Sequence, residues 1–316
     1  MGPDLKRAGN ETIVQHATRV TQAAISRWKS ALATSEDPRR QAIGLALENA
    51  HPESPGRKPQ DTPGNNNLVL LAIDSDDPVI YALAIGQCAD DYAMAPGPCQ
   101  GLSWEHWANI DSDNAVPWLW LAAKAGRSGD QQGVEAAFAR ASMASRFDEY
   151  DSTMSAIALS ALPRDAAPLD KAVAGLDVIV TVRIGIPAGE ISARLCSDTA
   201  VQQPTRKQQC TSVANDLADR GSTVFDAVVA SSLANRLGFP ADRQVTLQRE
   251  SLSAARALAA HNPWRYSGEG SDLRSEADFR CDTVLGYERF INALEAAGGS
   301  ERAALAAVGR TVQDAK

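Results

Sequence analysis

The chain has 316 residues, a formal charge of −8 and an isoelectric point near 5.1. A chain of this length can bury a sizeable core. Its acidic balance disfavours nucleic acids and anionic membrane surfaces as partners, because both require a basic surface to neutralise phosphate groups. Its apolar runs are too short for a helix to cross a bilayer. Strand-like alternation is scarce and Ala and Leu are abundant, so the sequence predicts an all-α fold.

A helix is predicted over residues 11–33, and the same type of helix start then occurs twice. Ser35-Glu36-Asp37-Pro38 precedes one apolar stretch, and Ser75-Asp76-Asp77-Pro78 precedes another 40 residues later. In both, an aspartate can cap a helix whose first position is proline. A third start, Ser112-Asp113-Asn114, comes 37 residues after Ser75. This spacing is typical of arrays of helical pairs. The proline-rich stretch 51–67 between the first two units is predicted to be a loop.

Two amphipathic helices are predicted within residues 114–145, separated by Gly129-Asp130. Their inward-facing residues are Trp118, Leu121, Ala122 and Ala125 in the first helix and Val134, Phe138 and Ala141 in the second. An ordinary helical hairpin would show the same pattern. Nevertheless, the positions of Trp118, Leu121, Gly129-Asp130, Phe138 and Ala141 resemble a tetratricopeptide repeat. The departures are Ala122 for Gly, Ala125 for Tyr, Val134 for Ala and Arg146 for the closing Pro. The resemblance implies a right-handed array of helical hairpins, a tetratricopeptide-like α-solenoid.

Further helices are predicted over residues 150–162, 168–184, 188–197, 205–219, 222–237, 240–260, 275–297 and 300–314. The repeated helix starts stop near residue 165. We therefore predict an N-terminal helical-repeat part over 1–164 and a helical C-terminal part over 165–316 packed on it. The segments DNAVPWLWLAAKAG, CTSVANDLADRGST and LANRLGFP resemble segments of uncharacterised proteins of Gram-negative bacteria. This resemblance does not identify any catalytic residue in the present sequence.

The cysteines indicate the compartment. Cys88 and Cys99 flank one short loop, and Cys196 and Cys210 flank another. Neither pair has the spacing of a zinc site, so each is interpreted as a local disulfide worth about 3 kcal/mol. Five reduced thiols in a cytoplasmic protein are the alternative. We expect a periplasmic or secreted protein from which an export signal has been removed, with Cys281 left unpaired.

Catalytic motifs are scarce. The four histidines are dispersed, and the sequence has no phosphate-binding glycine loop and no G-x-S-x-G turn. The acidic clusters at 74–77 and 111–114 lack the glycine and distal glutamate of an EF-hand, so helix capping explains them better. The sequence therefore predicts no cofactor and no metal site.

Candidate binding residues lie in two places. Trp104, Trp107 and Trp118 are interpreted as core, whereas Trp120 lies off the inward face of its helix and Arg127 follows on the same helix. The loop 261–273 combines aromatic and charged side chains with glycines, as functional loops often do. The candidate set is Trp120, Arg127, His261, Trp264, Arg265, Tyr266, Glu269 and Asp272.

The function that this sequence favours is non-catalytic protein recognition, as an adaptor, an inhibitor or immunity-type partner, or an envelope chaperone. A segment of another protein or a peptide would bind on the concave helical face. One alternative is a cell-envelope hydrolase in which Glu269 and Asp272 of the 261–273 loop act as paired carboxylates. Another is a structural subunit with a flat apolar side. The oligomeric state is left open.

Overall fold

The computed structural model describes residues 13–50, 63–90, 93–182, 184–261 and 281–314. Within these ranges the chain is all-helical apart from loops and one two-residue antiparallel strand pair, β1 (Ala89–Asp90) with β2 (Ala93–Met94). The first seven helices are α1 (Ile13–Ala33), α2 (Pro38–Ala50), α3 (Pro63–Asp74), α4 (Pro78–Cys88), α5 (Trp104–Ile110), α6 (Ala115–Ser128) and α7 (Gln131–Met143). The others are α8 (Asp151–Ser160), α9 (Pro168–Thr181), α10 (Ala188–Glu190), α11 (Pro204–Asp219), α12 (Val224–Leu237), α13 (Ala241–His261), α14 (Cys281–Ala296) and α15 (Glu301–Asp314).

The two predicted aspartate–proline starts are confirmed, and they have the same local geometry. Asp37 accepts a hydrogen bond from the backbone N–H of Arg39 at 2.9 Å, and Asp77 accepts one from that of Val79 at 2.9 Å. In each case the preceding serine hydroxyl accepts from the aspartate N–H. The two starts are also joined, because Arg39 Nε donates to Asp77 Oδ2 at 2.6 Å. The repeated sequence therefore places two neighbouring helix N-termini side by side, with α2 in contact with α4.

The predicted hairpin at 114–145 is confirmed as α6 and α7. Asn114 caps α6, Gly129 takes the left-handed conformation with φ of 77°, and Asp130 caps α7. Val134, Phe138 and Ala141 are buried as predicted. The expected face of α6 is partly wrong: Leu119 is fully buried, whereas Leu121 and Ala125 are only half-buried. The reason is that α6 packs against α5 as well as α7, so its buried surface is wider than one stripe.

The predicted loop 51–67 is wrong at its end. Residues 51–62 lie outside the described ranges, but α3 begins at Pro63. Proline fits the first turn of a helix, where its missing N–H costs nothing. The side chains of Leu68, Val69 and Ala72 are buried and pack this helix into the core. The helices predicted beyond residue 150 all form, including a buried helix rather than a strand at α9. Of the prediction over 275–297, residues 275–280 are not described.

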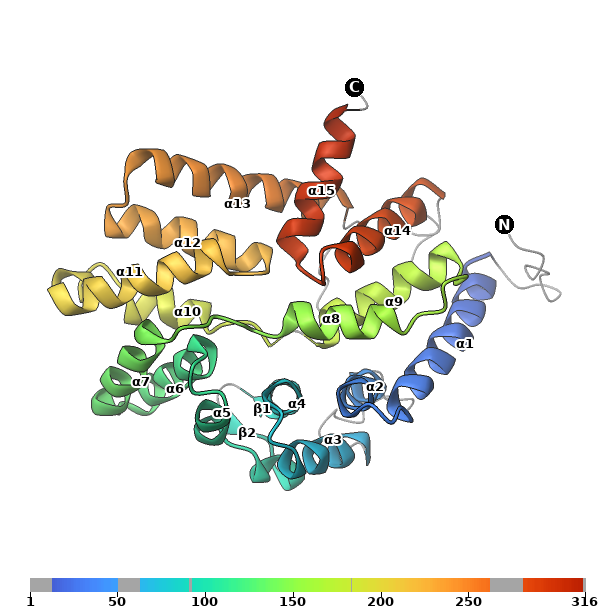
Figure 1. The fold of residues 1–316 in the computed structure, drawn as a ribbon, viewed down its shortest axis with the longest axis horizontal. Helices are drawn as coiled ribbons and strands as arrows, with labels where there is room; N and C mark the ends of the chain where they lie inside the picture. The colour runs from blue at the N-terminus through green and yellow to red at the C-terminus, as the bar shows by residue number, and fades with distance from the viewer. Residues whose placement is uncertain (1–12, 51–62, 91–92, 183, 262–280, 315–316) are drawn as a thin grey trace.

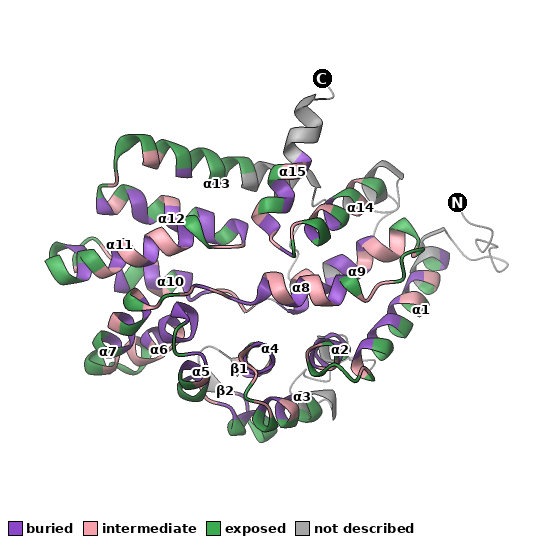
Figure 2. Ribbon diagram, viewed as in Figure 1, coloured by how far each residue is buried: buried purple, intermediate pink, exposed green. Residues whose placement is uncertain are grey.

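Figure 1 shows how the helices are arranged. The hairpins α1–α2 and α3–α4, then α5 and the α6–α7 hairpin, follow one another in an arc, and α11, α12 and α13 form a second layer. The helices α8 and α9 lie between these groups, where α8 contacts α2, and α9 contacts α1, α2 and α14. One hydrophobic cluster includes Ile85, Val178 and Leu233. The parts on either side of residue 165 therefore share a core, and Figure 2 marks buried residues along helices of both parts.

Both predicted disulfides are present. Cys88 is bonded to Cys99 with the Cα atoms 5.5 Å apart, and Cys196 is bonded to Cys210 with the Cα atoms 5.8 Å apart. All four half-cystines are buried. Both separations lie in the normal range for a disulfide. Among the described residues, no helix has the length and apolar character needed to cross a membrane.

Candidate functional site

Trp120 is half-buried and packed within the fold. Its ring stacks on that of Trp104 with the centroids 4.8 Å apart, and its Nε1 donates to the backbone oxygen of Gly185 at 3.2 Å. Trp104, Trp107 and Trp118 are buried, as the core interpretation predicted. These contacts give Trp120 a role in joining α6 to the chain that follows α9.

Arg127 lies near the end of α6 and is exposed. Its Nε donates to Glu190 Oε1 at 2.7 Å, and Glu190 also pairs with Arg194 at 3.3 Å. Arg127 is therefore part of a small ion-pair cluster between α6 and the turn of helix around α10.

The other predicted binding residues belong to the 261–273 loop. His261 is the last residue of α13, and its side chain is not described. Trp264, Arg265, Tyr266, Glu269 and Asp272 lie outside the described ranges. The prediction that this loop forms a contact surface remains a prediction.

An exposed apolar surface lies on α12 and α13. Phe225 and Val228 on α12, and Val245 and Leu252 on α13, are each between 41% and 55% exposed. In Figure 2 most of the described part of α13 is drawn as exposed. The two helices contact each other and run antiparallel from a turn at Gly238, which has φ of 71°. Because they are antiparallel, Leu252 lies at about the same level along the hairpin as Phe225 and Val228.

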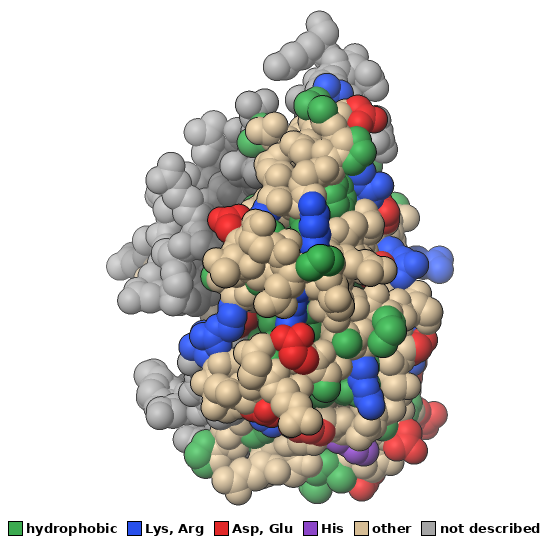
Figure 3. Space-filling view, turned by 90° about the vertical axis from the view of Figure 1, so that its left-hand side faces the viewer, with side chains coloured by type: hydrophobic (Ala, Val, Ile, Leu, Met, Phe, Trp, Pro, Cys, Tyr) green, Lys and Arg blue, Asp and Glu red, His purple; other side chains and the backbone are tan. Residues whose placement is uncertain are grey.

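The end of the molecule where α7 and α11 lie differs in the kind of side chain that it exposes. Figure 3 shows side chains of both charges interspersed on this face, with small apolar groups between them. Charged side chains are also paired across helices: Arg243 of α13 lies 3.1 Å from Asp219 of α11. This face therefore presents a mixed polar surface, whereas α12 and α13 each carry two exposed apolar side chains.

A segment that the sequence analysis did not single out lies at the centre of the fold. Residues 146–151, which we call the crossing segment, connect α7 to α8 with the sequence RFDEYD. Its residues contact two different sides of the fold. Arg146, Asp148 and Tyr150 face the turn before α6, whereas Glu149 and Asp151 contact the C-terminal helices. Four of its six residues are charged, and this density of charge is the one local signal in the segment.

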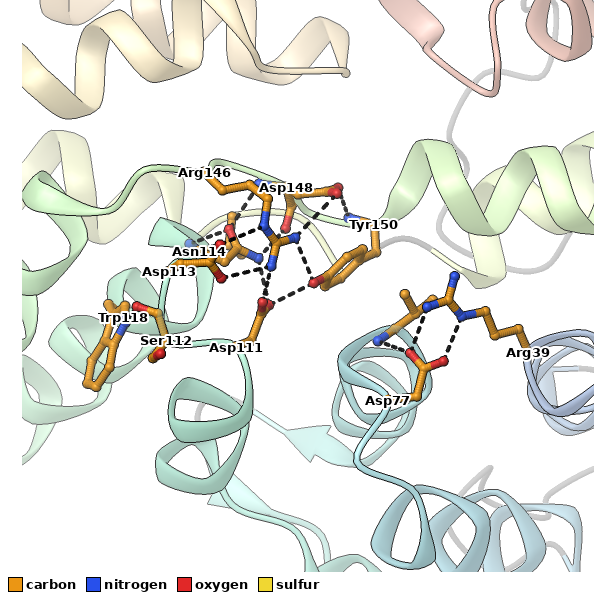
Figure 4. A network of polar contacts seen from close by, with 12 residues as sticks. Arg39, Asp77, Asp111, Ser112, Asp113, Asn114, Trp118, Arg146, Asp148 and Tyr150 are labelled. Atoms are coloured by element: carbon orange, nitrogen blue, oxygen red, sulfur yellow. Dashed lines mark hydrogen bonds and ion pairs between the residues drawn. The ribbon is translucent and has the colours of Figure 1, made fainter.

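Arg146 is at the centre of a polar network on the first side (Figure 4). Its Nη2 donates to the buried Asp111 and, at 3.2 Å, to Asp113. Its Nη1 donates to the hydroxyl oxygen of Tyr150 at 2.9 Å and lies 3.7 Å from Asp148. Three carboxylates thus surround one guanidinium.

The side-chain amide of Asn114 fixes the backbone of this network. Its Oδ1 accepts from the N–H groups of Val116 and Asp148, and its Nδ2 donates to Asp111 Oδ2 and to the carbonyl of Asp148. Every hydrogen-bonding position of the amide is used. The backbones of Asp113, Ala115 and Arg146 add two further hydrogen bonds. The crossing segment is therefore held to the start of α6 by main-chain and side-chain bonds together.

The surroundings shift the pKa of several groups in this network. Burial raises the pKa of the Tyr150 hydroxyl, which stays neutral and donates to Asp111. The hydrogen bond from Arg146 lowers the pKa of Asp113, and burial raises that of Asp148. Tyr150 has φ of 64°, a conformation that is costly for a residue with a side chain. A neutral phenol and a guanidinium enclosed by carboxylates act as a clamp between the crossing segment and the start of α6.

The second side of the crossing segment is acidic and mostly buried. Asp151 Oδ1 accepts from the N–H of Ile184 at 3.0 Å, and Glu301 Oε2 accepts from the N–H of Val224 at 3.0 Å. Asp151 and Glu301 line a cavity of about 20 Å³, which is room for one water molecule. The other lining residues are Ser155, Ile179, Val182, Ser222, Thr223, Leu294 and Gly299.

Within the described ranges, no group of three or more His, Cys, Asp or Glu side chains has the arrangement of a metal site. Comparison of the chain with protein-family models, with curated proteins and with solved structures finds no match.

Proposed function

We propose that this chain is a non-catalytic protein-binding module built from helical hairpins, and that it binds another protein or a peptide through the α12–α13 hairpin. The observation that carries the proposal is the set of exposed apolar side chains Phe225, Val228, Val245 and Leu252 on these two neighbouring helices. Each such side chain, when buried by a partner, would stabilise the complex by up to about 1.5–3 kcal/mol.

The spacing of these side chains suits a helical partner. Phe225 and Val228 are three residues apart on α12, and Val245 and Leu252 are seven apart on α13, so each pair lies on one face of its helix. An amphipathic helix can pack its apolar side chains against two neighbouring helices of this kind. An adaptor, an inhibitor or immunity-type partner, or an envelope chaperone would use such a surface.

The proposed architecture is a tetratricopeptide-like, right-handed array of hairpins. It is supported by the α1–α2, α3–α4 and α6–α7 hairpins and by the repeated helix starts at Asp37 and Asp77. The inner side of this arc is covered by α8 and α9. We therefore assign the partner to the α12–α13 hairpin rather than to the concave face that the sequence favoured.

The proposed location is the periplasm or the extracellular space. It is supported by the two disulfides, because such bonds form and persist in oxidising compartments. In this setting both disulfides would brace helix ends next to loops.

Photo-crosslinking tests the proposed surface. A photoreactive phenylalanine analogue replaces Phe225, and in a second protein it replaces Lys207, which is exposed on α11. After irradiation in a cell-envelope preparation, we expect one defined protein adduct from position 225 and none from position 207.

A matched pair of surface variants makes the test specific. Val228→Asp should remove the adduct, whereas Ser232→Asp, one turn further along α12, should leave it unchanged. Both residues are exposed, so neither variant should unfold the chain. The proposal is wrong if position 225 gives no adduct, or if the adduct is insensitive to Val228→Asp.

A further inference from the structure

Two arginines that are far apart in the chain meet at one carboxylate. Arg127 is near the end of α6, and Arg194 belongs to the π-helical turn Ile191–Leu195 that follows α10. The Nε of Arg127 lies 2.7 Å from Glu190 Oε1, and the Nε of Arg194 lies 3.3 Å from Glu190 Oε2. Each oxygen of Glu190 therefore contacts a different guanidinium group, which brings the two arginine side chains together.

A glycine in α6 gives Arg194 room to lie against this helix. A Cβ atom at Gly126 would be 3.0 Å from Arg194 Nη1 and 3.4 Å from its Cδ. The first distance is shorter than an ordinary van der Waals contact, so a larger residue would displace the guanidinium group. The same Cβ position is 3.7 Å from the side chain of Val134 in α7. Gly126 thus lets Arg194 approach the α6–α7 hairpin beside Arg127.

The arginine side chains are accessible, whereas the carboxylate between them is not. The side chains of Arg127 and Arg194 are 49% and 51% exposed, and that of Glu190 is 11% exposed. Glu190 therefore lies deeper than the two guanidinium groups and contacts them through their Nε atoms. A guanidinium group carries five N–H donors in one plane, so a contact through Nε uses only one of them.

The two arginines and Glu190 together carry one positive charge in excess, in a chain with a formal charge of −8. Other charged groups nearby are matched. Lys124, about one turn earlier on α6, is paired with Glu105 at 2.6 Å, and Asp130 at the hairpin turn accepts from an N–H of α7 at 2.9 Å. Arg236 of α12 donates to carbonyl groups of the π-helical turn and is paired with an exposed aspartate at 2.9 Å.

We propose that Arg127 and Arg194 form a binding site for an oxyanion, a phosphate or a carboxylate group. The oxyanion would accept charge-assisted hydrogen bonds from both guanidinium groups, whose N–H donors match the geometry of such ligands. Glu190 would stay beneath them and keep the two side chains in place. The site goes beyond the proposed partner surface and uses none of its four apolar side chains, so either proposal can fail without the other.

Nuclear magnetic resonance of the arginine side chains in the full chain tests this site. The protein is titrated with sodium phosphate, and separately with sodium acetate, at constant ionic strength so that screening does not change. We expect the Nε–Hε resonances of Arg127 and Arg194 to shift to a plateau with at least one of these anions. The resonance of Arg243, which is paired with Asp219, should shift far less. The anion that gives the plateau shows whether the site takes phosphate groups, carboxylates or both.

Three variants separate this geometry from an effect of net charge. Arg194→Gln should weaken binding of the same anion by about fivefold or more, because one of the two cations is lost. Arg243→Gln removes the same charge elsewhere and should change binding by less than about twofold. Gly126→Ala keeps every charge and suits a helix, yet its methyl group would displace Arg194 and weaken binding.

The site is refuted if neither anion shifts the resonances of Arg127 and Arg194 to a plateau. Equal effects of Arg194→Gln and Arg243→Gln would overturn it as well, because net charge would then explain the binding. Unchanged binding by Gly126→Ala would also contradict it, since the two guanidinium groups would not need to lie together. Circular dichroism of each variant checks that the chain is folded.

Discussion

Tyr150 donates a hydrogen bond from its hydroxyl group to the buried carboxylate of Asp111 at 2.9 Å. The two residues are 39 positions apart in the chain, and the backbone of Tyr150 adopts a left-handed conformation at the point where α8 begins. Arg146 donates to the same phenol oxygen and to the same carboxylate. The connection between α7 and α8 is therefore an ordered part of the core, fixed to the start of α6.

Removing the guanidinium of Arg146 should destabilise the chain. Arg146→Ala takes away one donor to the buried carboxylate of Asp111, which keeps its bonds to Asn114 and Tyr150. We expect a loss of about 1–3 kcal/mol in the free energy of unfolding, measured by urea denaturation. Arg146→Lys should recover part of it, because an ammonium group cannot reproduce the forked contacts. The clamp is contradicted if Arg146→Ala costs no more than the control Arg164→Ala at an exposed position.

The ion pair between Lys29 and Asp177 allows the packing of α9 against α1 to be tested. Their charged atoms are 2.8 Å apart, and both side chains are buried. Lys29→Met would leave the charge of Asp177 without this partner, so we expect a loss of about 3–5 kcal/mol. Lys124→Met breaks an exposed ion pair with Glu105 and should cost about 1 kcal/mol or less. Equal effects of the two variants would argue against a buried α1–α9 contact.

Trp118 tests the packing of the α6–α7 hairpin. It is buried, its Nε1 donates to the backbone oxygen of Ser112 at 3.0 Å, and the guanidinium of Arg140 lies 4.5 Å from its ring centroid. Trp118→Ala should destabilise the chain by about 3–5 kcal/mol. Met143→Ala, on the same hairpin but 75% exposed, should change stability by less than about 0.5 kcal/mol. A change under about 1 kcal/mol for Trp118→Ala would show that the hairpin packs differently.

Thiol titration tests the covalent structure. The chain has five cysteines, and two disulfides use four of them. Denatured but unreduced protein should therefore show one reactive thiol per chain, and reduction should lower the free energy of unfolding by about 3 kcal/mol for each bond. Five reactive thiols in protein isolated from its native compartment would remove the argument for export.

The features that the sequence predicted correctly are encoded locally. The capping residues Asp37, Asp77 and Asp130 act within their own helix starts, and a residue two or three positions away completes each contact. The disulfides likewise join residues 11 and 14 positions apart. Patterns of this range are visible in a single sequence because helical periodicity and turn chemistry determine them.

The features that the sequence did not reveal depend on long-range contacts. The position of Trp120 off the inward face of α6 suggested an exposed side chain, but a residue 65 positions later accepts its hydrogen bond. The four charged residues of the crossing segment do not by themselves indicate an ordered connection, which depends on distant partners such as Asp111, 39 positions before Tyr150. Periodicity also identifies α8 and α9 as helices without saying that they cover the inner side of the arc.

The central structural claim is that the crossing segment is an ordered connection joining the start of α6 to the C-terminal helices. Hydrogen exchange at the amides of Arg146 and Asp148 tests it most directly, because they donate to Asp113 and Asn114, both at 3.0 Å. We predict protection close to that of amides within α6, since opening either bond requires the clamp to separate. Exchange of both amides at the rate of an unstructured peptide would contradict the claim.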